Sequence, residues 1–576
     1  MNVSHGRHHN SIIRSSNGCW TCRLRRKKCD ENHPVCDTCS ALHITCHYSQ
    51  DKPEWMDNGA RQEEMAERLK REVKENAHRR IWGRAVHVPD GDHLEAIGDI
   101  RNGGMRPHPE VSADRTQRGT DCTAIRKEAR GNIPFGRSDT ILLTFYLEHL
   151  FPFLFPFYRP PLLEGGKAWV LEMMISSPVV RKAALCQSSY FFSLSREMDQ
   201  RDAVWDTVLQ QTREAFEMLR QSLQVIASSD ITEHPHGAAR VMSGIMQVQR
   251  FEIALLSFEN CRAHLSAALA LFRQLCVGAV SQTGLSSSFS TVISRLGPPS
   301  SILPAQSVQV PSAEQAAFRF SSALLIFDDI IASTVLQEKP RLYEYHDSLL
   351  NDVNNTTPPI NLAATVGCQN WVLLQIGRIA ALDAWKQDRK QEGGLNVIEL
   401  VQSATAIKDS LEGHLRQLEI GSAIVPEKSL SLLDVLTSDH SQRSTLANQS
   451  SLVTRVWAHA ALIYLLFVVN GWQPASVEIR YHVSRIINLL TNQISPLTLL
   501  RTMVWPFCVA GCLAEPAQEV HFRGVVEALQ VPRVCGTVRK ALEIMENVWR
   551  NRSTEDITNR DLAACFRSQG DLVLLV

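Results

Sequence analysis

The 576-residue chain lacks the features that would place it among secreted, membrane or strongly charged proteins. It has no net charge, because 60 lysine and arginine residues balance 60 aspartate and glutamate residues. Its first twenty residues contain no apolar core, so no secretory signal peptide is indicated. The apolar run at 456–469 is too short to cross a bilayer and predicts a buried core helix. We therefore expect no membrane partner.

Catalytic signatures are also missing. The chain has no phosphate-binding glycine loop, no G-x-S-x-G elbow and no H-E-x-x-H motif. Asp328 and Asp329 are adjacent, and neighbours on a helix point about 100° apart, so we expect solvated or capping carboxylates. His149 and His459 lie on apolar helical segments, where we expect core histidines. No catalytic residue is predicted, and we do not expect an enzyme.

The chain does contain a dense group of cysteines near its start. They are Cys19, Cys22, Cys29, Cys36, Cys39 and Cys46. The half-motif C-x2-C-x6-C occurs twice, and zinc in structural sites takes four ligands. Six thiolates can therefore serve two zinc ions only if two sulfurs bridge both metals. Because a cytosolic or nuclear compartment keeps thiols reduced, we expect two zinc ions there and no disulfides.

A second arrangement uses four of these cysteines. Cys19, Cys22, Cys36 and Cys39 alone form C-x2-C-x13-C-x2-C, which is similar to the first zinc module of nuclear receptors. This single site leaves two cysteines unused at matching offsets, and the number of bound zinc ions separates the alternatives. Three nearby histidines are expected to lie on the surface, because the thiolates already saturate two ions: His33, His43 and His47.

A basic run lies between the second and third cysteines. It consists of Arg23, Arg25, Arg26, Lys27 and Lys28. Residues 1–50 contain seven basic and three acidic residues, a net charge of +4, so the rest of the neutral chain carries −4. A small metal-folded module with this charge indicates binding to double-stranded DNA. The alternative is a zinc-stapled module that binds protein or RNA, for which five charges at this place have no evident use.

These features, with Pro34 two residues before the fourth cysteine, resemble the fungal binuclear zinc-cluster transcription factors. The resemblance implies that Cys19 and Cys36 bridge the two zinc ions. One site would then be completed by Cys22 and Cys29, and the other by Cys39 and Cys46.

The resemblance also implies a mode of DNA recognition. The short helix after Cys22 would point its C-terminal end into the major groove, with Arg26 at the base-contacting position, where the family more often has lysine. Arginine can bond O6 and N7 of guanine together, which is compatible with the CGG-like triplets of the family. The implied function is regulation of RNA polymerase II genes in the nucleus, together with the transcription machinery.

Composition and motif positions divide the whole chain into segments of different character. We expect a disordered tail at 1–18, the zinc cluster at 19–46, a connector and charged helix at 47–82, a flexible linker at 83–134, a helical domain at 135–551 and a C-terminal tail at 552–576. Helical periodicity dominates and strand-like alternation is rare, so the fold class is mostly α. Within the helical domain we expect one long helix at 237–275, followed by a Ser/Pro-rich loop at 277–312. Motifs beginning at Phe151, Phe327, Trp505 and Ala541 resemble the second type of fungal-specific transcription factor domain.

The charged helix at 59–80 is a weak candidate for a dimerising coiled coil. Its apolar residues, including Met65, Leu69 and Val73, recur every four positions, whereas a coiled coil needs a period of 3.5. We expect a solvated linker helix with a narrow apolar stripe, and a 1–85 segment that is mainly monomeric at micromolar concentration. Any stable homodimer should form through the helical domain.

Overall fold

The structure is a computed structural model that describes most of the chain outside the N-terminal tail and the linker. The described residues are 18–40, 42, 44–49, 51–83, 136–161, 165–195, 201–227, 234–258, 260–277, 284–301, 309–351, 357–421, 440–495, 497–529, 536–552, 562–567 and 573–576. The chain divides into two compact units, Met1–His87 and Val88–Val576. The tail predicted at 1–18 and the linker predicted at 83–134 lie almost wholly outside the described residues.

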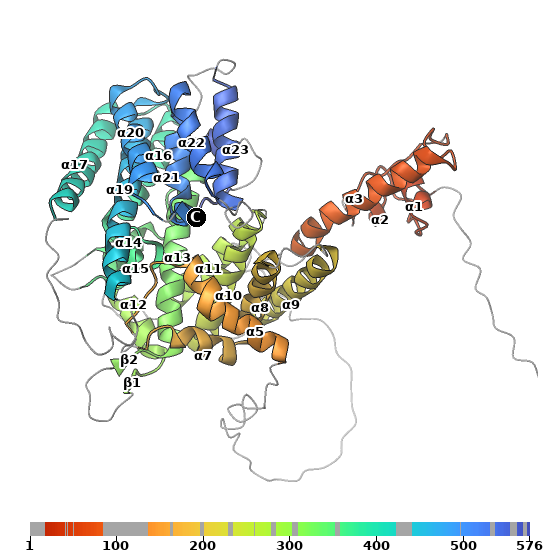
Figure 1. The fold of residues 1–576 in the computed structure, drawn as a ribbon, viewed down its shortest axis with the longest axis horizontal. Helices are drawn as coiled ribbons and strands as arrows, with labels where there is room; N and C mark the ends of the chain where they lie inside the picture. Colours follow the sequence, from red (N-terminus) through yellow and green to blue (C-terminus); the bar gives the residue numbers. More distant parts are fainter. Residues whose placement is uncertain are drawn as a thin grey trace, which may run out of the picture. The chain divides into compact units, whose positions relative to one another are not determined.

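The first unit contains the six cysteines of the repeated motif and three helices, drawn in red and orange in Figure 1. They are α1 (Trp20–Leu24), α2 (Asp37–Ser40) and α3 (Ala60–Gly83). The two short helices each begin directly after a cysteine. The charged helix predicted at 59–80 is confirmed as α3.

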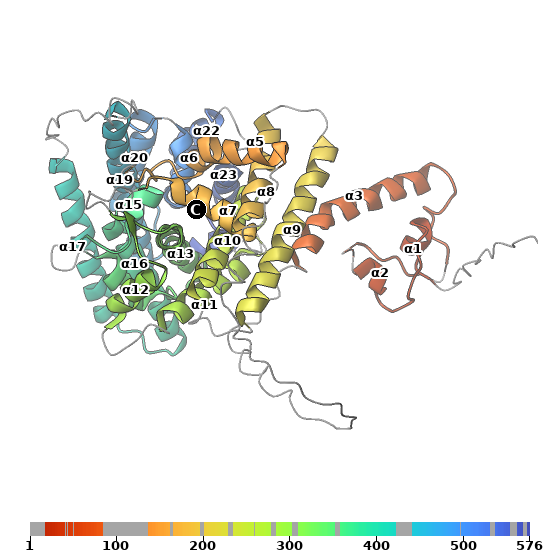
Figure 2. The same ribbon diagram turned by 90° about the horizontal axis from the view of Figure 1, so that it is seen from below.

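The second unit is built almost entirely from helices (Figures 1 and 2). Its N-terminal half contains α5 (Arg137–Phe145), the π-helix η2 (Tyr146–Leu150), α6 (Phe151–Leu154), α7 (Ala168–Ser176), α8 (Pro178–Ser195), α9 (Arg201–Ala227), α10 (Pro235–Ala254), α11 (Cys261–Val277) and α12 (Gly284–Arg295). Two short strands follow, β1 (Ser300–Ser301) and β2 (Gln309–Val310), which pair antiparallel.

The C-terminal half of this unit continues the helical pattern. It contains α13 (Ala313–Leu336), α14 (Tyr343–Leu350), α15 (Leu362–Val366), α16 (Asn370–Gln391), α17 (Val397–Gly421), α19 (His440–Asn470), α20 (Val477–Asn492), the 3₁₀ helix η4 (Leu497–Thr502), α21 (Val504–Cys512), the 3₁₀ helix η5 (Pro516–Gln518), α22 (Glu519–Glu527), α23 (Gly536–Arg550) and α24 (Leu562–Arg567). The mostly α fold class is confirmed.

Helix α13 forms the centre of the second unit. It contacts α7, α10, α11, α15, α16 and α24. Its start is fixed by a capping box, in which the Ser312 hydroxyl accepts the Gln315 N–H and the Gln315 side chain accepts the Ser312 N–H. All but three of its 24 residues are buried, so the remaining helices pack around it.

Two of the four resemblance motifs pack against each other between α21 and α23. Gly511 of α21 faces Met545 of α23 so closely that a Cβ atom would come within 1.7 Å of the Met545 sulfur. The indole of Trp549 donates to the Gly511 carbonyl at 2.8 Å. Trp505 in turn stacks on Trp457 of α19 with ring centroids 5.5 Å apart. These motifs therefore serve core packing.

Helix α19 contains the apolar run found in the sequence. Within the described chain, Asn448–Asn470 is the one helix long and apolar enough to cross a membrane, but 83% of its apolar window is buried inside the protein. The prediction of a core helix is confirmed.

Two expected boundaries in the second unit are wrong. The single helix expected at 237–275 is broken into α10 and α11, because Leu256 adopts a left-handed conformation with φ of 58°. The Ser257 N–H then bonds back to the Glu252 carbonyl at 3.0 Å and closes the end of α10. The Ser/Pro-rich segment at 277–312 contains α12, because Phe289, Val292 and other apolar residues are buried.

Two further expectations are wrong: that His149 is a core histidine and that the residues after 551 form a tail. His149 is exposed. The π-helical turn η2 contains one residue more than an α-helical turn, so side chains there point in directions that the apolar pattern did not predict. In the segment expected as a C-terminal tail, α24 contacts α13 and α23. Phe566 and Leu574 are completely buried, so the described residues after 551 belong to the core of the second unit.

Candidate metal centre and nucleic-acid interface

The two cysteine half-motifs fold into the same turn, as their repeated spacing suggests. In the first, the Cys22 N–H donates to the Cys19 sulfur at 3.3 Å. In the second, the Cys39 N–H donates to the Cys36 sulfur at 3.4 Å. In both, the N–H of the next residue bonds to the carbonyl of the first cysteine, at 3.1 and 2.8 Å. Each turn thus directs two sulfurs to the same side.

The basic run begins where α1 ends in a tight turn. The Lys27 N–H bonds to the Cys22 carbonyl at 3.0 Å and the Arg26 N–H to the Arg23 carbonyl at 3.1 Å. This is the Schellman pattern, which needs a left-handed residue between helix and loop. That residue is Arg26, with φ of 55°. The metal-binding half-motif therefore also fixes the backbone that carries the basic side chains.

Four sulfurs meet in the centre of the module. Cys19, Cys22, Cys36 and Cys39 are all buried, and their sulfurs lie within 4.8 Å of one another. Four of these separations are 3.7–3.8 Å. Two sulfurs on a tetrahedral zinc ion with bonds of about 2.3 Å lie roughly 3.8 Å apart. This group has the spacing of a tetrahedral zinc site.

The other two cysteines adjoin the same group. The Cys46 sulfur lies 3.9 Å from that of Cys36, and the Cys29 sulfur accepts the Cys19 N–H at 3.4 Å. Cys36 therefore contacts sulfurs of both half-motifs, which a bridging ligand must do. The short distance between Cys22 and Cys39 also suits two ligands of one ion, so the geometry fits the four-cysteine alternative as well.

Most of these buried thiols need a nearby positive charge to ionise to thiolates. Burial raises the pKa of Cys36 to about 12, and it also raises the pKa values of Cys19 and Cys39. Burial acts in the same direction on Cys29, but hydrogen bonds from the Tyr48 hydroxyl and from a backbone N–H lower its pKa to about 7. A bound metal ion supplies the charge that favours the thiolates. Soft sulfur ligands in this number suit zinc, so the donor set fits the implied metal.

Residues outside the cysteine pattern hold the half-motifs together. The Asp30 carboxylate accepts the N–H groups of Asp37 and Thr38, at 2.8 and 2.9 Å, at the start of α2. Desolvation acts to raise the pKa of Asp30, but these donors lower it to about 2. The Thr21 hydroxyl donates to the Thr45 carbonyl at 2.9 Å and accepts the His47 N–H at 3.0 Å. The sequence analysis missed these roles, which short polar side chains do not reveal by spacing.

Helix α3 contributes to the same module. Val73 packs against the cysteine cluster, and Leu69, one turn earlier on the same face, is only 2% exposed. The narrow apolar stripe expected on this helix therefore packs within the module at Leu69 and Val73, while its charged residues up to position 70 are exposed. Of the nearby histidines, His33 is exposed as predicted and stacks on Tyr48, His47 is half-buried, and His43 lies outside the described residues.

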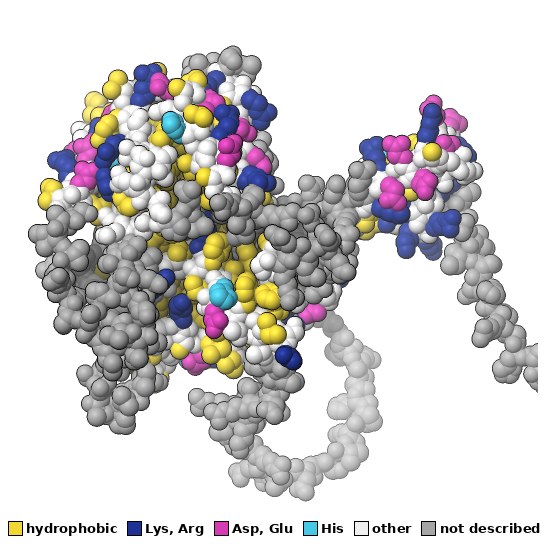
Figure 3. Space-filling view, viewed as in Figure 1, with side chains coloured by type: hydrophobic (Ala, Val, Ile, Leu, Met, Phe, Trp, Pro, Cys, Tyr) yellow, Lys and Arg dark blue, Asp and Glu magenta, His cyan; other side chains and the backbone are white. Residues whose placement is uncertain are grey.

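The basic side chains remain accessible. Arg23, Arg26, Lys27 and Lys28 are exposed, and Arg25 is half-buried. The Arg23 guanidinium lies 4.5 Å from the centre of the Trp20 ring. Figure 3 shows several Lys and Arg side chains at the surface of this module. The run can therefore contact a polyanion without rearrangement of the cysteine cluster.

The acidic pair of the second unit is buried and split between two partners. Asp328 is fully buried and pairs with Arg250 of α10 at 2.5 Å, while Asp329 accepts the Leu342 N–H at the start of α14 at 2.8 Å. Burial raises the pKa of each carboxyl to about 6. The prediction of solvated carboxylates is wrong, although Asp329 does cap a helix. His459 is a core histidine, as predicted.

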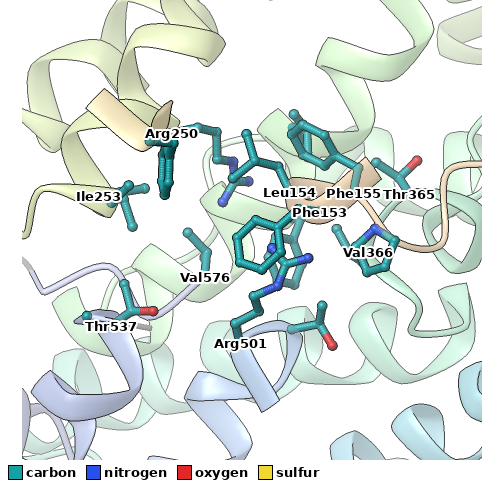
Figure 4. Close-up of a pocket in the computed structure, with 17 residues that line it drawn as sticks. Phe153, Leu154, Phe155, Arg250, Ile253, Thr365, Val366, Arg501, Thr537 and Val576 are labelled. Carbon is teal, nitrogen blue, oxygen red and sulfur yellow. The ribbon is translucent and has the colours of Figure 1, made fainter. Parts of the chain in front are cut away.

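A cavity of about 110 Å³ lies beside this ion pair (Figure 4). Arg250 and Arg501 approach it from different helices, and the Arg501 guanidinium stacks 3.8 Å from the centre of the Phe153 ring. The other lining side chains are apolar, threonine or glycine. Among the described residues, the side chains of the lining include no carboxylate, imidazole or thiol with which to build a catalytic pair.

Both units match known protein families. Residues 17–54 match the fungal Zn(2)-Cys(6) binuclear cluster domain, and residues 141–575 match the fungal specific transcription factor domain. No solved structure matches the chain.

Similar proteins extend along the whole chain. Transcription factor dibT of Pestalotiopsis microspora is 33% identical over 97% of this chain and 99% of its own length. Pestheic acid cluster transcriptional regulator 3 of Pestalotiopsis fici is 29% identical, over 96% of this chain and 97% of its own. The ustiloxin B cluster transcription factor ustR of Aspergillus flavus is 26% identical, over 93% and 94%. The chain belongs to the fungal transcription factors that join a zinc-cluster module to a fungal-specific transcription factor domain.

Proposed function

We propose that this protein is a sequence-specific, DNA-binding regulator of RNA polymerase II genes that acts in the nucleus. The observation that carries the proposal is the exposed basic run on a turn fixed by the cysteine cluster. In this function Arg26 contacts guanine in CGG-like triplets in the major groove, and Lys27 and Lys28 contact phosphates. The helical second unit has a regulatory and not a catalytic role.

We further propose that the module holds two zinc ions. Cys19 and Cys36 would bridge them, with Cys22 and Cys29 completing one site and Cys39 and Cys46 the other. The matched family is defined by two zinc ions and six cysteines, and Cys36 adjoins sulfurs from both half-motifs. Zinc in this site is structural: it gathers the thiolates and thereby positions α1 and the basic turn.

Metal analysis of residues 1–87 tests the zinc count. Two zinc ions per chain are expected for the wild type. One zinc ion, retained when Cys29 and Cys46 are both changed to serine, would establish the four-cysteine alternative. Cys36→Ser should reduce zinc content most, together with Cys19→Ser, because each bridging sulfur serves both metals.

DNA recognition is tested by fluorescence anisotropy of the full chain on matched duplexes. One duplex carries CGG triplets and the other has the same composition with the triplets scrambled. Each altered base pair should cost about 1–3 kcal/mol, and affinity for both duplexes should fall as salt increases. Equal affinity for the two duplexes, or preference for RNA of the same sequence, would favour the alternative of an RNA- or protein-binding module.

The names of the relatives suggest the kind of target. Two of them regulate named metabolite clusters, for pestheic acid and ustiloxin B. We propose by analogy that this protein controls a biosynthetic gene cluster. Genome-wide mapping of its binding sites, with transcript levels after deletion of its gene, should place its sites upstream of co-regulated neighbouring genes; sites scattered among unrelated genes would contradict the analogy.

A further inference from the structure

A second and larger cavity opens within the helical unit and is lined by residues of that unit. Its volume is about 440 Å³, within the roughly 300–1,000 Å³ of typical small-molecule sites. Its lining comes from the segment around Tyr158, from α7, from α13 and from the residues before α15. Four prolines contribute to the lining: Pro160, Pro161, Pro311 and Pro359. None of these residues is used by the zinc module.

The cavity reaches the central helix. Of the 24 residues of α13, only Ala316, Arg319 and Leu336 are not buried. Ala316 and Arg319 lie one turn apart and both line the cavity. A helix that is otherwise packed on all sides therefore presents one small and one cationic side chain to this space.

A rigid aromatic wall lies next to Arg319. The Trp169 indole donates to the Tyr158 hydroxyl at 2.9 Å. The Phe320 ring centre lies 4.6 Å from that of Tyr158 and 5.4 Å from that of Trp169. Because the three rings brace one another, they offer a preformed apolar surface to a flat ligand.

Arg319 forms no ion pair with the residues that the structure describes. Within the described chain, no carboxylate lies within ion-pair distance of its guanidinium, although Glu172 of α7 also lines the cavity. Desolvation lowers the pKa of Arg319, and the nearby Tyr158 opposes this shift. The Arg319 side chain is exposed where it lines the cavity, so an anion there can reach the guanidinium and form charge-assisted hydrogen bonds with it.

We propose that this cavity binds a small planar aromatic carboxylate, with its ring on the Tyr158–Trp169–Phe320 wall and its carboxylate on Arg319. The ligand site would add a binding function to the helical unit, independent of which DNA sequence the zinc module recognises.

The cavity of Figure 4 is less suited to such a ligand. Its volume is about 110 Å³, a quarter of the 440 Å³ of the cavity beside Arg319. Its cations are also engaged, since Arg250 pairs with Asp328 and Arg501 stacks on Phe153. The inference therefore rests on the space around Arg319 alone.

Isothermal titration calorimetry of the full zinc-loaded chain tests the proposal with two probes of the same shape. The probes are 2-naphthoate and its neutral analogue naphthalene-2-carboxamide. We expect 2-naphthoate to bind at one site per chain and at least tenfold more tightly than the amide, because only the carboxylate can pair with Arg319. No binding of 2-naphthoate at millimolar concentration, or equal affinity for the two probes, would overturn the proposal.

Three variants locate the site. Arg319→Gln should weaken 2-naphthoate at least tenfold and leave the amide unchanged, and Ala316→Leu, which fills the cavity floor, should weaken both probes. Arg416→Gln removes a 70% exposed arginine of α17 outside this cavity and should change neither. Unchanged 2-naphthoate affinity in the Ala316→Leu variant would overturn the assignment to this cavity, even if Arg319→Gln failed to fold.

Discussion

At Arg26 one residue carries both a structural and a recognition role. Its backbone is left-handed, a conformation that costs a non-glycine residue roughly 1 kcal/mol, and its side chain is exposed beyond the end of α1. Glycine would satisfy the turn at no cost, so the turn alone does not account for arginine at this place. The side chain is better explained by what it contacts outside the protein.

We predict that Arg26→Gly separates these roles. The variant should keep its zinc and fold, because glycine favours the left-handed turn, but lose discrimination at one base pair of the site, by about 1–3 kcal/mol. Anisotropy on matched and single-mismatch duplexes measures this. Lys28→Ala is the control and should weaken all duplexes alike, lowering the salt slope by about one unit. Equal weakening of all duplexes by Arg26→Gly would contradict the base contact.

Part of the apolar stripe of helix α3 packs against the cysteine cluster of the same unit. Its apolar residues repeat every four positions, which suits contact with a compact neighbour better than a long coiled-coil seam. Val73 packs on the cysteine cluster and Leu69 is buried, so this part of the stripe is covered within one chain. The helix therefore contributes apolar cover to a module whose core is otherwise mainly cysteine.

We predict that Leu69→Ala destabilises this module without changing its oligomeric state. Loss of a leucine that is 2% exposed should lower the free energy of unfolding of zinc-loaded 1–87 by about 2–3 kcal/mol. Urea unfolding and sedimentation velocity measure the two effects, with the exposed Arg68→Ala as control. A wild-type dimer at micromolar concentration that Leu69→Ala dissociates would show that the stripe is a coiled-coil seam after all.

The contact between α19 and α20 contains a pair of buried histidines. Their Nδ1 atoms lie 3.0 Å apart, and burial lowers the pKa of His459 to about 3 and that of His482 to about 4. Both rings are therefore neutral in the folded protein at neutral pH. One ring donates the hydrogen bond and the other accepts it.

We predict that this pair makes the helical unit sensitive to acid. In the unfolded chain both histidines take up protons below about pH 6.5, whereas in the folded chain they do not until about pH 4, so stability falls as pH falls through that window. Each histidine should contribute a loss of roughly 2 kcal/mol between pH 7 and pH 5. The raised pKa values of Asp328 and Asp329 act in the opposite direction, so the histidine contribution is read from the difference between the wild type and the variant. Urea unfolding of the full chain at both pH values measures it. His482→Gln, which still can hydrogen-bond to His459, should show a smaller loss, and an identical loss would exclude this origin.

The whole molecule consists of two units with different sources of stability. The first unit has few apolar residues and depends on its thiolates and a metal, whereas the second is a large helical core. Removing the metal should therefore affect one unit and spare the other.

We predict that a strong zinc chelator unfolds the cysteine module of the full chain and leaves the second unit folded. Far-ultraviolet circular dichroism should lose only a small part of its helical signal, and the main thermal transition should stay within about 2 °C of its original position. The matched control is residues 136–576, which should not respond to the chelator. A large loss of helix on chelation would show that the second unit depends on the zinc module.

The sequence alone determined the parts of this protein that follow from local chemistry. Ligand spacing specifies a metal site, because the ligand demand of zinc is known. Helical periodicity predicted the mostly α fold class, because the apolar face of a helix is encoded by residues close together in the sequence. The family resemblance, now confirmed, rested on the same short patterns.

The tertiary structure decided what depends on contacts between distant segments. Leu256 ends α10 without the glycine that usually marks such a turn, so no local signal predicted the break. Asp328 is buried because Arg250, 78 positions away, lies opposite it. Arg319 gains its importance only because α7, α13 and the Tyr158 segment enclose a space around it. Whether a residue is buried depends on which distant segments pack against it, so the sequence of one segment does not determine it.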